Sequence, residues 1–236
     1  MINIRKSQDR GYANHGWLDS YHSFSFAEYY DPDYMAYSVL RVINEDKVAG
    51  GTGFGMHPHR DMEIITYMLA GELRHQDSMG NGSVIGAGDV QRMTAGRGIR
   101  HSEVNASTEN EVHLLQIWLM PDQNGLPPSY EDKHIDAGKK LNQWCLVASP
   151  DAHDDSLKIH QDVTLWASIL QPEKTLSYTL NDARCAYLHV ARGQLVLNGQ
   201  ILSAGDAAML RDEAEIKLKA TEESEILLFD LPNLDS

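Results

Sequence analysis

The chain has 236 residues, of which 42% are hydrophobic and 23% charged, a composition typical of a globular protein with one large β domain or two smaller ones. Its formal net charge of -14 repels nucleic acid and anionic membranes, so we expect no direct nucleic-acid partner and no membrane partner. Residues 1–7 lack an apolar signal region and no segment is long and apolar enough to span a bilayer, which predicts a cytoplasmic protein. Cys145 and Cys185 lie far apart and outside any paired motif, so we expect neither a disulfide framework nor a thiolate zinc site.

Short runs of alternating apolar and polar residues follow one another along the chain. Clear examples are residues 38–43, 62–69 and 112–120, and Gly-rich turn signals separate such runs. Helical periodicity is weak throughout. Many short strands at this spacing predict an all-β protein made of sandwiches or barrels.

A second series of strands follows the Pro- and Gly-rich segment 121–128. It repeats features of the first series, and the similar stretches are 65–73 with 186–195 and 85–93 with 202–210. These paired similarities indicate an internal duplication. We therefore predict two tandem barrels, an N-terminal one over residues 1–134 and a C-terminal one over residues 135–236.

Two short motifs contain good metal ligands at positions i and i+2. They are His57-Pro58-His59 and His101-Ser102-Glu103. Side chains two residues apart in a strand point to the same face, so each motif directs both of its donors into one cavity. Three imidazoles and a carboxylate form a mononuclear metal site with positions left for water, O2 or substrate. The second strand series has no counterpart of these four residues, so we expect the C-terminal barrel to bind no metal there.

The spacing around these ligands resembles the two cupin motifs. The first runs from Gly51 through His57, His59 and Glu63 to Gly71, and the second runs from Gly88 through Thr94, Gly96, Gly98 and His101 to Asn105. The motifs are irregular, since Gly71 comes one residue late, the second motif has two extra residues, and Thr94 stands in place of the usual proline. Together with Asn14–Leu18 and His22–Ala27, these departures resemble the pirin family, specifically bacterial pirins of the quercetin 2,3-dioxygenase type. The resemblance covers the N-terminal half closely and the C-terminal half only in general layout.

This resemblance implies a bicupin fold of two jelly-roll barrels and one bound iron ion. The ligands it implies are His57, His59, His101 and Glu103, and the activity is cleavage of the central ring of a flavonol such as quercetin by O2 with release of carbon monoxide. Glu103 is then also the expected catalytic base for the flavonol 3-hydroxyl group. Fe(II) is the expected metal, although Zn, Mn, Co, Ni or Cu suit the same ligands because the first-row affinity order does not select iron.

Three further residues are candidates for supporting the ligands. Glu63 is an even number of positions from His57 and His59, as side chains on one face of a strand are, so this spacing alone does not exclude it as a ligand. We interpret it instead as a structural carboxylate that orients a histidine. His113 and Gln116 lie on a predicted strand and could reach the cavity. A lone histidine in such a place is more often a hydrogen-bonded core residue.

Other functions compete with the dioxygenase. The main alternative is a non-enzymatic, metal-loaded regulator whose redox state changes its affinity for a protein partner. A zinc sugar-phosphate isomerase would need a cationic pocket, for which Arg92, Arg97 and Arg100 are candidates, although turn and strand positions facing solvent explain them as well. An aromatic group could enclose a flat ligand or belong to the core: Phe24, Phe26, Tyr29, Tyr30, Tyr34 and Tyr37.

Overall fold

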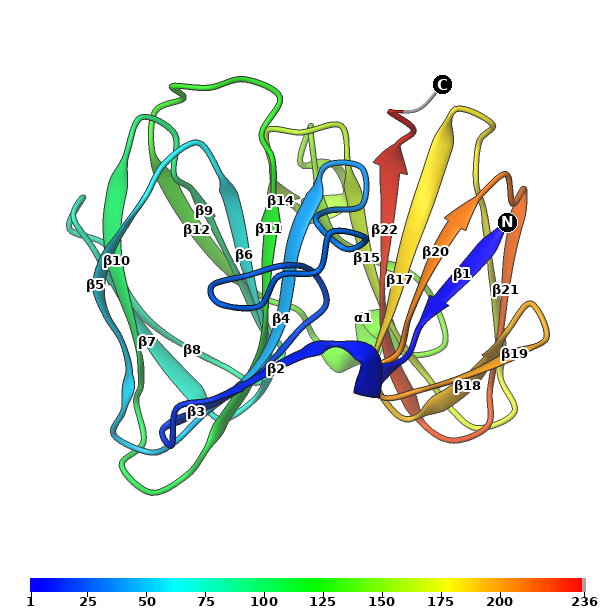
Figure 1. The fold of residues 1–236 in the computed structure, drawn as a ribbon, viewed down its shortest axis with the longest axis horizontal. Helices are drawn as coiled ribbons and strands as arrows, with labels where there is room; N and C mark the ends of the chain where they lie inside the picture. The colour runs from blue at the N-terminus through cyan, green and yellow to red at the C-terminus, as the bar shows by residue number, and fades with distance from the viewer. Residues whose placement is uncertain (235–236) are drawn as a thin grey trace. The chain divides into compact units, whose positions relative to one another are not determined.

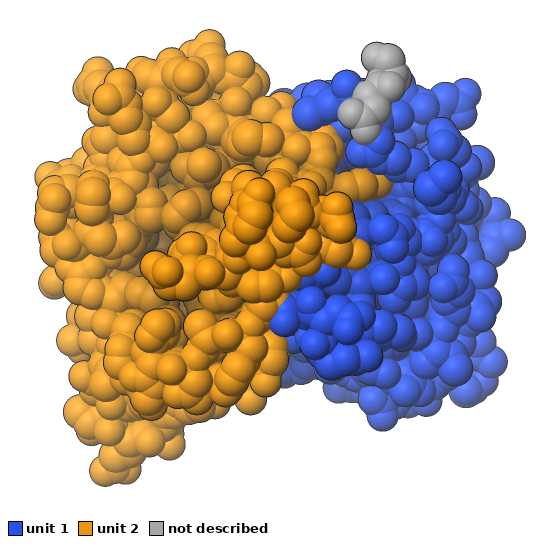
Figure 2. All heavy atoms as spheres, in the orientation of Figure 1, with its two compact units in different colours: residues 1–10, 135–158, 162–236 blue, residues 11–134, 159–161 orange. Residues whose placement is uncertain are grey.

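The computed structural model describes residues 1–234, and almost all of its regular structure is β-strand (Figure 1). These residues form two compact units, coloured separately in Figure 2. The N-terminal barrel contains residues 11–134 and 159–161, and the C-terminal barrel contains residues 1–10, 135–158 and the chain from 162 onward. The predicted all-β architecture is confirmed. No helix among the described residues is long and apolar enough to cross a membrane.

The N-terminal barrel consists of two antiparallel sheets. The seven-stranded sheet has the order β12 (Ser129–His134), β9 (Asp89–Thr94), β6 (Glu63–Ala70), β11 (Val112–Leu119), β4 (Leu40–Val48), β3 (Leu18–His22) and β2 (Gly11–Asn14). The four-stranded sheet has the order β5 (Gly53–His59), β10 (Ile99–Asn105), β7 (Glu72–Asp77) and β8 (Gly82–Gly86). The alternating sequence specifies which face of a strand is inside: in β7 every second residue is buried.

The C-terminal barrel also consists of a seven-stranded and a four-stranded sheet. The larger has the order β1 (Ile2–Arg5), β20 (Ala207–Arg211), β17 (Arg184–Arg192), β22 (Ser224–Pro232), β15 (Thr164–Leu170), β13 (Cys145–Ser149) and β14 (Leu157–Lys158). The smaller has the order β16 (Thr175–Thr179), β21 (Glu215–Ala220), β18 (Gln194–Leu197) and β19 (Gln200–Ser203). Three short helical segments complete the regular structure: η1 (Ser7–Asp9), α1 (Ala137–Lys140) and η2 (His153–Asp155).

The two barrels repeat one strand order, as the paired sequence similarities indicate. Strands β9, β6, β11 and β4 correspond to β20, β17, β22 and β15, and β5, β10, β7 and β8 correspond to β16, β21, β18 and β19. A glycine at positive φ joins β6 to β7 and β17 to β18, with φ of 76° at Gly71 and 80° at Gly193. A Cβ at either position would come within 3 Å of a backbone oxygen, 2.7 Å at Gly71 and 2.2 Å at Gly193. Glycine is therefore required in both turns.

The compact units differ at two places from the predicted division into 1–134 and 135–236. Residues 1–10 belong to the C-terminal barrel, because β1 pairs with β20 and its apolar residues Ile2 and Ile4 pack against that core. The strand covers an edge of the sheet that would otherwise have unpaired backbone groups. The sequence of this short strand carries no sign of which barrel it joins.

The second difference is the segment 159–161, which lies in the N-terminal barrel. Gln161 Nε2 donates a 2.8 Å hydrogen bond to the carbonyl oxygen of Met120. The Pro- and Gly-rich segment 121–128 connects β11 to β12 inside the same barrel, so it is an internal loop and not the boundary between the two units.

A layer of polar side chains distinguishes the N-terminal barrel from its repeat. Two apolar clusters occupy its interior, one around Met68 and the other around Ile64. Between them a row of facing residues crosses five neighbouring strands, in the order Gln91, Thr66, Gln116, Asn44 and His22. We call these five residues the polar row. The matching row of the C-terminal barrel is apolar and consists of Ala208, Leu188, Leu228, Trp166 and Leu146.

Candidate metal centre

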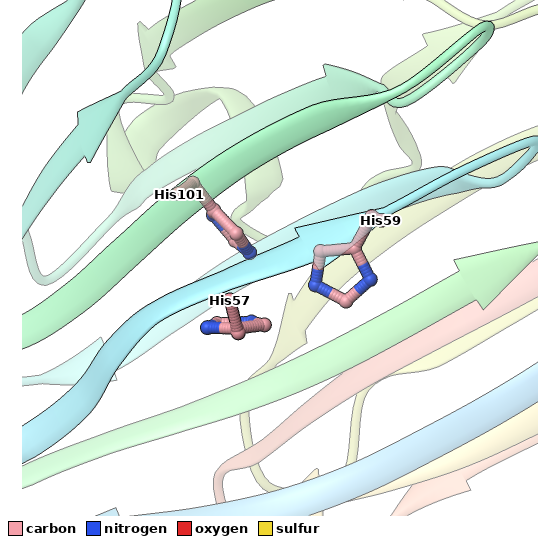
Figure 3. Close-up of side chains that lie close together, drawn as sticks. All are labelled: His57, His59 and His101. Atoms are coloured by element: carbon pink, nitrogen blue, oxygen red, sulfur yellow. The ribbon is translucent and has the colours of Figure 1, made fainter.

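Three histidine side chains meet inside the N-terminal barrel (Figure 3). His57 and His59 come from β5, and His101 comes from β10, where it lies opposite His57 in the antiparallel register. Their ring centroids are 4.5 to 4.8 Å apart, and a nitrogen of each lies within 4.8 Å of the others. The structure thus brings three of the four predicted ligands together, and the spacing of two residues in β5 places both of its rings on one face.

A β-bulge shapes this part of the site. The pairing of β10 with β5 shifts between His101 and Glu103, so that Glu103 lies opposite Phe54. Gly55 has no partner in this register, and its carbonyl oxygen accepts a 2.7 Å hydrogen bond from His57 Nδ1. Because Nδ1 then carries the ring hydrogen, Nε2 of His57 has the lone pair that a metal ion requires.

Burial keeps two of the imidazoles neutral. Burial is the largest cause that lowers the pKa of His59 to about 4, and the neighbouring rings of His101 and His57 add to it. Burial likewise lowers the pKa of His101 to about 3, with further contributions from His57 and His75. The neutral imidazole is the form that coordinates a metal ion.

The hydrogen bonding of His101 tests whether these residues fit a metal ion. The side chain is 1% exposed, and neither ring nitrogen has a hydrogen-bond partner among residues 1–234. A buried polar atom without a partner destabilises the folded protein, and a metal ion bound to one nitrogen would remove part of that cost. The buried, neutral and unsatisfied His101 therefore fits a divalent metal ion.

Glu103 is held by hydrogen bonds from the facing sheet. Its Oε1 accepts hydrogen bonds from Gln91 Nε2 at 2.8 Å and from Thr66 Oγ1 at 3.1 Å. Its Oε2 accepts one from Gln116 Nε2 at 2.8 Å. A carboxylate accepts about four hydrogen bonds, so one position, on Oε2, remains for a metal ion or a proton. All three donors belong to the polar row, which thus fixes this carboxylate.

His75, which the sequence does not single out, lies on the other side of the histidine cluster. It forms a second close group with His101 and Glu103, whose potential ligand atoms lie within 4.8 Å of one another. Its ring stacks on Tyr130 with centroids 4.4 Å apart, and its Nε2 lies 3.4 Å from Asp77 Oδ2. His101 belongs to both groups, so it connects the cluster of three histidines to the group that contains Glu103.

Gln116, predicted as a supporting residue, contacts Glu103, but Glu63 does not reach the centre. Thr94 Oγ1 donates a 3.1 Å hydrogen bond to Glu63 Oε2, and the backbone N–H of His160 lies 3.4 Å from the same oxygen. Burial raises the pKa of the Glu63 carboxyl. Strand parity does not apply to Glu63, because the chain turns between the end of β5 and the start of β6.

His113 is likewise placed away from the centre. Its Nε2 lies 2.9 Å from Glu45 Oε1, on the neighbouring strand β4. His113 and Gln116 are three residues apart on β11, and an odd separation along a strand puts two side chains on opposite faces. Only one of the two could face the cavity, and it is Gln116.

The C-terminal barrel has no equivalent centre among its described residues. The inward positions of β16 and β21 are Leu176, Tyr178, Ile216 and Leu218, which belong to or pack against one apolar cluster. Both groups of potential metal ligands in the described chain lie in the N-terminal barrel. The C-terminal barrel therefore repeats the strands of the N-terminal barrel but has an apolar interior at the equivalent place.

A cavity of about 660 Å³ opens at the metal centre. Its lining includes His57, His59, Glu103 and Gln116. Six large aromatic side chains also line it: Tyr12, Trp17, Phe26, Tyr29, Phe54 and Trp118. The ring of Trp118 meets that of His59 edge-on with centroids 4.9 Å apart. Apolar aromatic walls with a few converging polar groups suit a flat aromatic ligand.

The predicted aromatic group divides between cavity and core. Phe26 and Tyr29 line the cavity, whereas Phe24 is buried at 1% exposure outside it and Tyr30 is 72% exposed. Sequence reasoning missed Trp118, although its even separation from Gln116 puts the two on one face of β11.

The three arginines Arg92, Arg97 and Arg100 do not line this cavity. Arg92 is buried, and its guanidinium donates to Ser129 Oγ at 2.6 Å and to Glu131 Oε2 at 3.0 Å. Arg92 is paired with Glu131 and used structurally, and no arginine lines the cavity at the metal centre, so this cavity is not the cationic pocket that a sugar-phosphate isomerase needs.

Comparison with known proteins agrees with this fold. Residues 3–119 match the family model of pirin, and residues 146–231 match that of the quercetinase C-terminal cupin domain. The chain is 50% identical over 234 residues to quercetin 2,3-dioxygenase of Escherichia coli K12, covering 98% of this chain and 99% of that one. It is 42% identical over 231 residues to the pirin-like protein of Caulobacter vibrioides, covering 98% and 99% of the two chains.

Solved structures give the same result. The crystal structure of YhhW from Escherichia coli superposes with a TM-score of 0.96 at 49% identity, covering 99% of each chain. The bacterial pirin YhhW in complex with nickel(II) superposes with a TM-score of 0.95 at 48% identity, covering 99% of this chain and all of that one. The chain belongs to the pirin family of bicupin proteins.

Proposed function

We propose that this chain is a metal-dependent dioxygenase that opens the central ring of flavonols such as quercetin with O2 and releases carbon monoxide. The observation that carries the proposal is the histidine cluster with its adjacent carboxylate at an aromatic cavity of about 660 Å³. The relative named quercetin 2,3-dioxygenase, at 50% identity over nearly the whole chain, supports the same activity. A cytoplasmic location is part of the same proposal for this protein.

His57, His59, His101 and Glu103 are the proposed ligands of one divalent metal ion. When bound, such an ion would supply a Lewis acid for the oxygen atoms of the flavonol and open positions for O2. We propose iron(II) as the native metal. The nickel(II) complex of the relative supports the view that this ligand type also accepts other first-row ions.

Glu103 is the proposed catalytic base. The flavonol becomes electron-rich enough to react with O2 once its 3-hydroxyl group has lost a proton, and the one acceptor position left on Oε2 takes either the metal ion or this proton, not both at once. Gln116 and Gln91 hold the carboxylate from the facing sheet, so the base does not have to be ordered when the substrate arrives. Trp118 and Phe54 flank the cavity and keep water from the flat rings of the substrate.

The direct test is oxygen uptake in an oxygen electrode. Metal-free protein is reconstituted anaerobically with Fe(II), Mn(II), Co(II), Ni(II), Cu(II) or Zn(II) and then given quercetin and O2. We expect uptake that depends on the metal, is absent from His57→Ala and is retained by His113→Gln, whose side chain faces away from the cavity. Metal binding without O2 uptake for any ion would reject the dioxygenase for quercetin and favour the metal-loaded regulator with a protein partner.

A further inference from the structure

Four polar side chains form a second polar group in the cavity. Ser20 and His22 lie on β3, and Asp46 and Asn44 lie opposite them on β4. All four line the cavity, and none is more than 4% exposed. We call them the β3–β4 polar group.

The hydrogen bonds inside this group leave two atoms available. Ser20 Oγ donates to Asp46 Oδ1, and His22 Nδ1 lies 2.8 Å from Asn44 Oδ1. No described residue donates to Asp46 Oδ2 or accepts from Asn44 Nδ2. The two residues are two positions apart in β4 and face the cavity together. The group therefore presents one acceptor and one donor to a ligand.

The fold does not need a carboxyl group at these positions. In the C-terminal barrel, the residue that corresponds to Asn44 is Trp166, the one that corresponds to His22 is Leu146, and the one that corresponds to Asp46 is the buried but uncharged Ser168. Burial raises the pKa of Asp46 to about 7, with a contribution from Glu103, so keeping this carboxyl inside the barrel costs stability. Because the C-terminal barrel stays folded with an uncharged residue at the position of Asp46, the fold itself gives no structural reason to bear that cost.

Aromatic rings cover the same group. The ring of His22 lies 5.4 Å from that of Phe26 and is stacked with that of Tyr29 at 6.3 Å. Gly11 lies opposite His22 in the register, and a Cβ on Gly11 would come within 2.3 Å of the Tyr29 ring. Glycine at position 11 therefore admits the ring of Tyr29, and an aromatic ring of a ligand that reaches this group would lie among aromatic side chains.

We infer that the β3–β4 polar group is a subsite for a phenolic hydroxyl group of the substrate, separate from the oxygen atoms bound at the metal centre. A phenolic hydroxyl donates one hydrogen bond and accepts another, which matches the open acceptor on Asp46 and the open donor on Asn44. The preferred substrates are therefore flavonols with hydroxyl groups in addition to the 3-hydroxyl group. This inference rests on the proposed function, because it takes the metal centre as the binding site of the 3-hydroxyl and 4-carbonyl oxygens.

The experiment compares the binding of two ligands to zinc-loaded protein without O2, so that no turnover is needed. Quercetin carries hydroxyl groups on both outer rings, and 3-hydroxyflavone keeps the metal-binding oxygens but has no others. Asp46→Leu and Asn44→Leu should each weaken the binding of quercetin about tenfold or more, and change that of 3-hydroxyflavone by less than about twofold. The matched control is Glu45→Gln, which lies on the opposite face of β4 and should bind both flavonols as the wild type does.

Retained affinity for 3-hydroxyflavone shows that the variants fold and keep the metal centre. Equal losses for the two flavonols, or no loss for quercetin, would overturn the inference. Galangin, which has hydroxyl groups on the fused ring and none on the pendant ring, assigns the bound hydroxyl to one ring. If the wild-type protein binds neither flavonol, both the proposed function and this inference are rejected. If the variants lose quercetin binding as predicted but the wild type takes up no O2 with quercetin, the subsite is supported and only the dioxygenase activity is rejected.

Discussion

Gln116 Nε2 donates a 2.8 Å hydrogen bond to Glu103 Oε2, and this bond joins β11 of the larger sheet to β10 of the smaller one. Thr66 Oγ1 lies 3.1 Å from the other carboxylate oxygen and 3.2 Å from Gln116 Oε1. The orientation of Glu103 is therefore set by residues that precede and follow it in the chain and belong to the facing sheet. Such outer contacts orient ligands in metal sites generally.

Gln116→Leu should weaken metal binding. The substitution keeps an inward side chain of similar size but removes the donor to Glu103, so we expect a loss of about 10- to 100-fold in affinity for Zn(II) or Ni(II). Competition with a chromophoric chelator measures it. Gln200→Leu, at an exposed position of β19, is the matched control. Equal affinities for the two variants would show that the bond has no part in metal binding.

His101→Ala should abolish stoichiometric metal binding. This residue belongs to both close groups of potential ligands, so its loss removes a donor from either arrangement. After reconstitution and dialysis, elemental analysis should find one ion per chain in the wild type and far less in the variant. His113→Ala removes a histidine that pairs with Glu45 and should retain the ion. A full complement of metal in His101→Ala would exclude this histidine as a ligand.

Local patterns predicted much of this structure. The alternation of apolar and polar residues predicted the strands. The spacing of two residues between His57 and His59 predicted the histidine pair. The similar stretches that contain Gly71 and Gly193 predicted the duplication. The residues that hold Glu103 were harder to predict from the sequence, because their contacts depend on the register in which the strands pair. Thr66 lies in a largely apolar run, and nothing in the sequence of that run shows that Gln116 lies beside it.

Without metal, acid should destabilise the protein through His59 and His101. Their pKa values are lowered to about 4 and about 3 in the folded state, below the ordinary 6.5, so between these values the unfolded chain binds more protons than the folded one. The free energy of unfolding therefore decreases as the pH falls from about 6.5 toward 4. Urea unfolding of chelator-treated protein at pH 7, 6 and 5 measures the effect.

The double variant His59→Gln/His101→Gln is the control for this pH dependence. It lacks both imidazoles, so its unfolding midpoint should fall less between pH 7 and pH 5 than that of the metal-free wild type. If the two proteins lose the same amount, other groups cause the acid sensitivity.

Asp46→Asn should stabilise the protein most at alkaline pH. Burial first, and then the charge of Glu103, raise the pKa of Asp46 from 3.8 to about 7, so the folded state binds more protons than the unfolded state between these values. The free energy of unfolding therefore falls as the pH rises through this window, and the full cost of the buried charge is present above pH 7. A shift of this size corresponds to about 4 kcal/mol, so we expect Asp46→Asn to gain roughly 2–4 kcal/mol at pH 8 and clearly less at pH 5. Asp33→Asn makes the same chemical change at an exposed position and should gain little at either pH. A gain for Asp46→Asn that does not change between pH 5 and pH 8 would mean that folding does not raise the pKa of this carboxyl, and that the subsite presents an ionised carboxylate to its ligand.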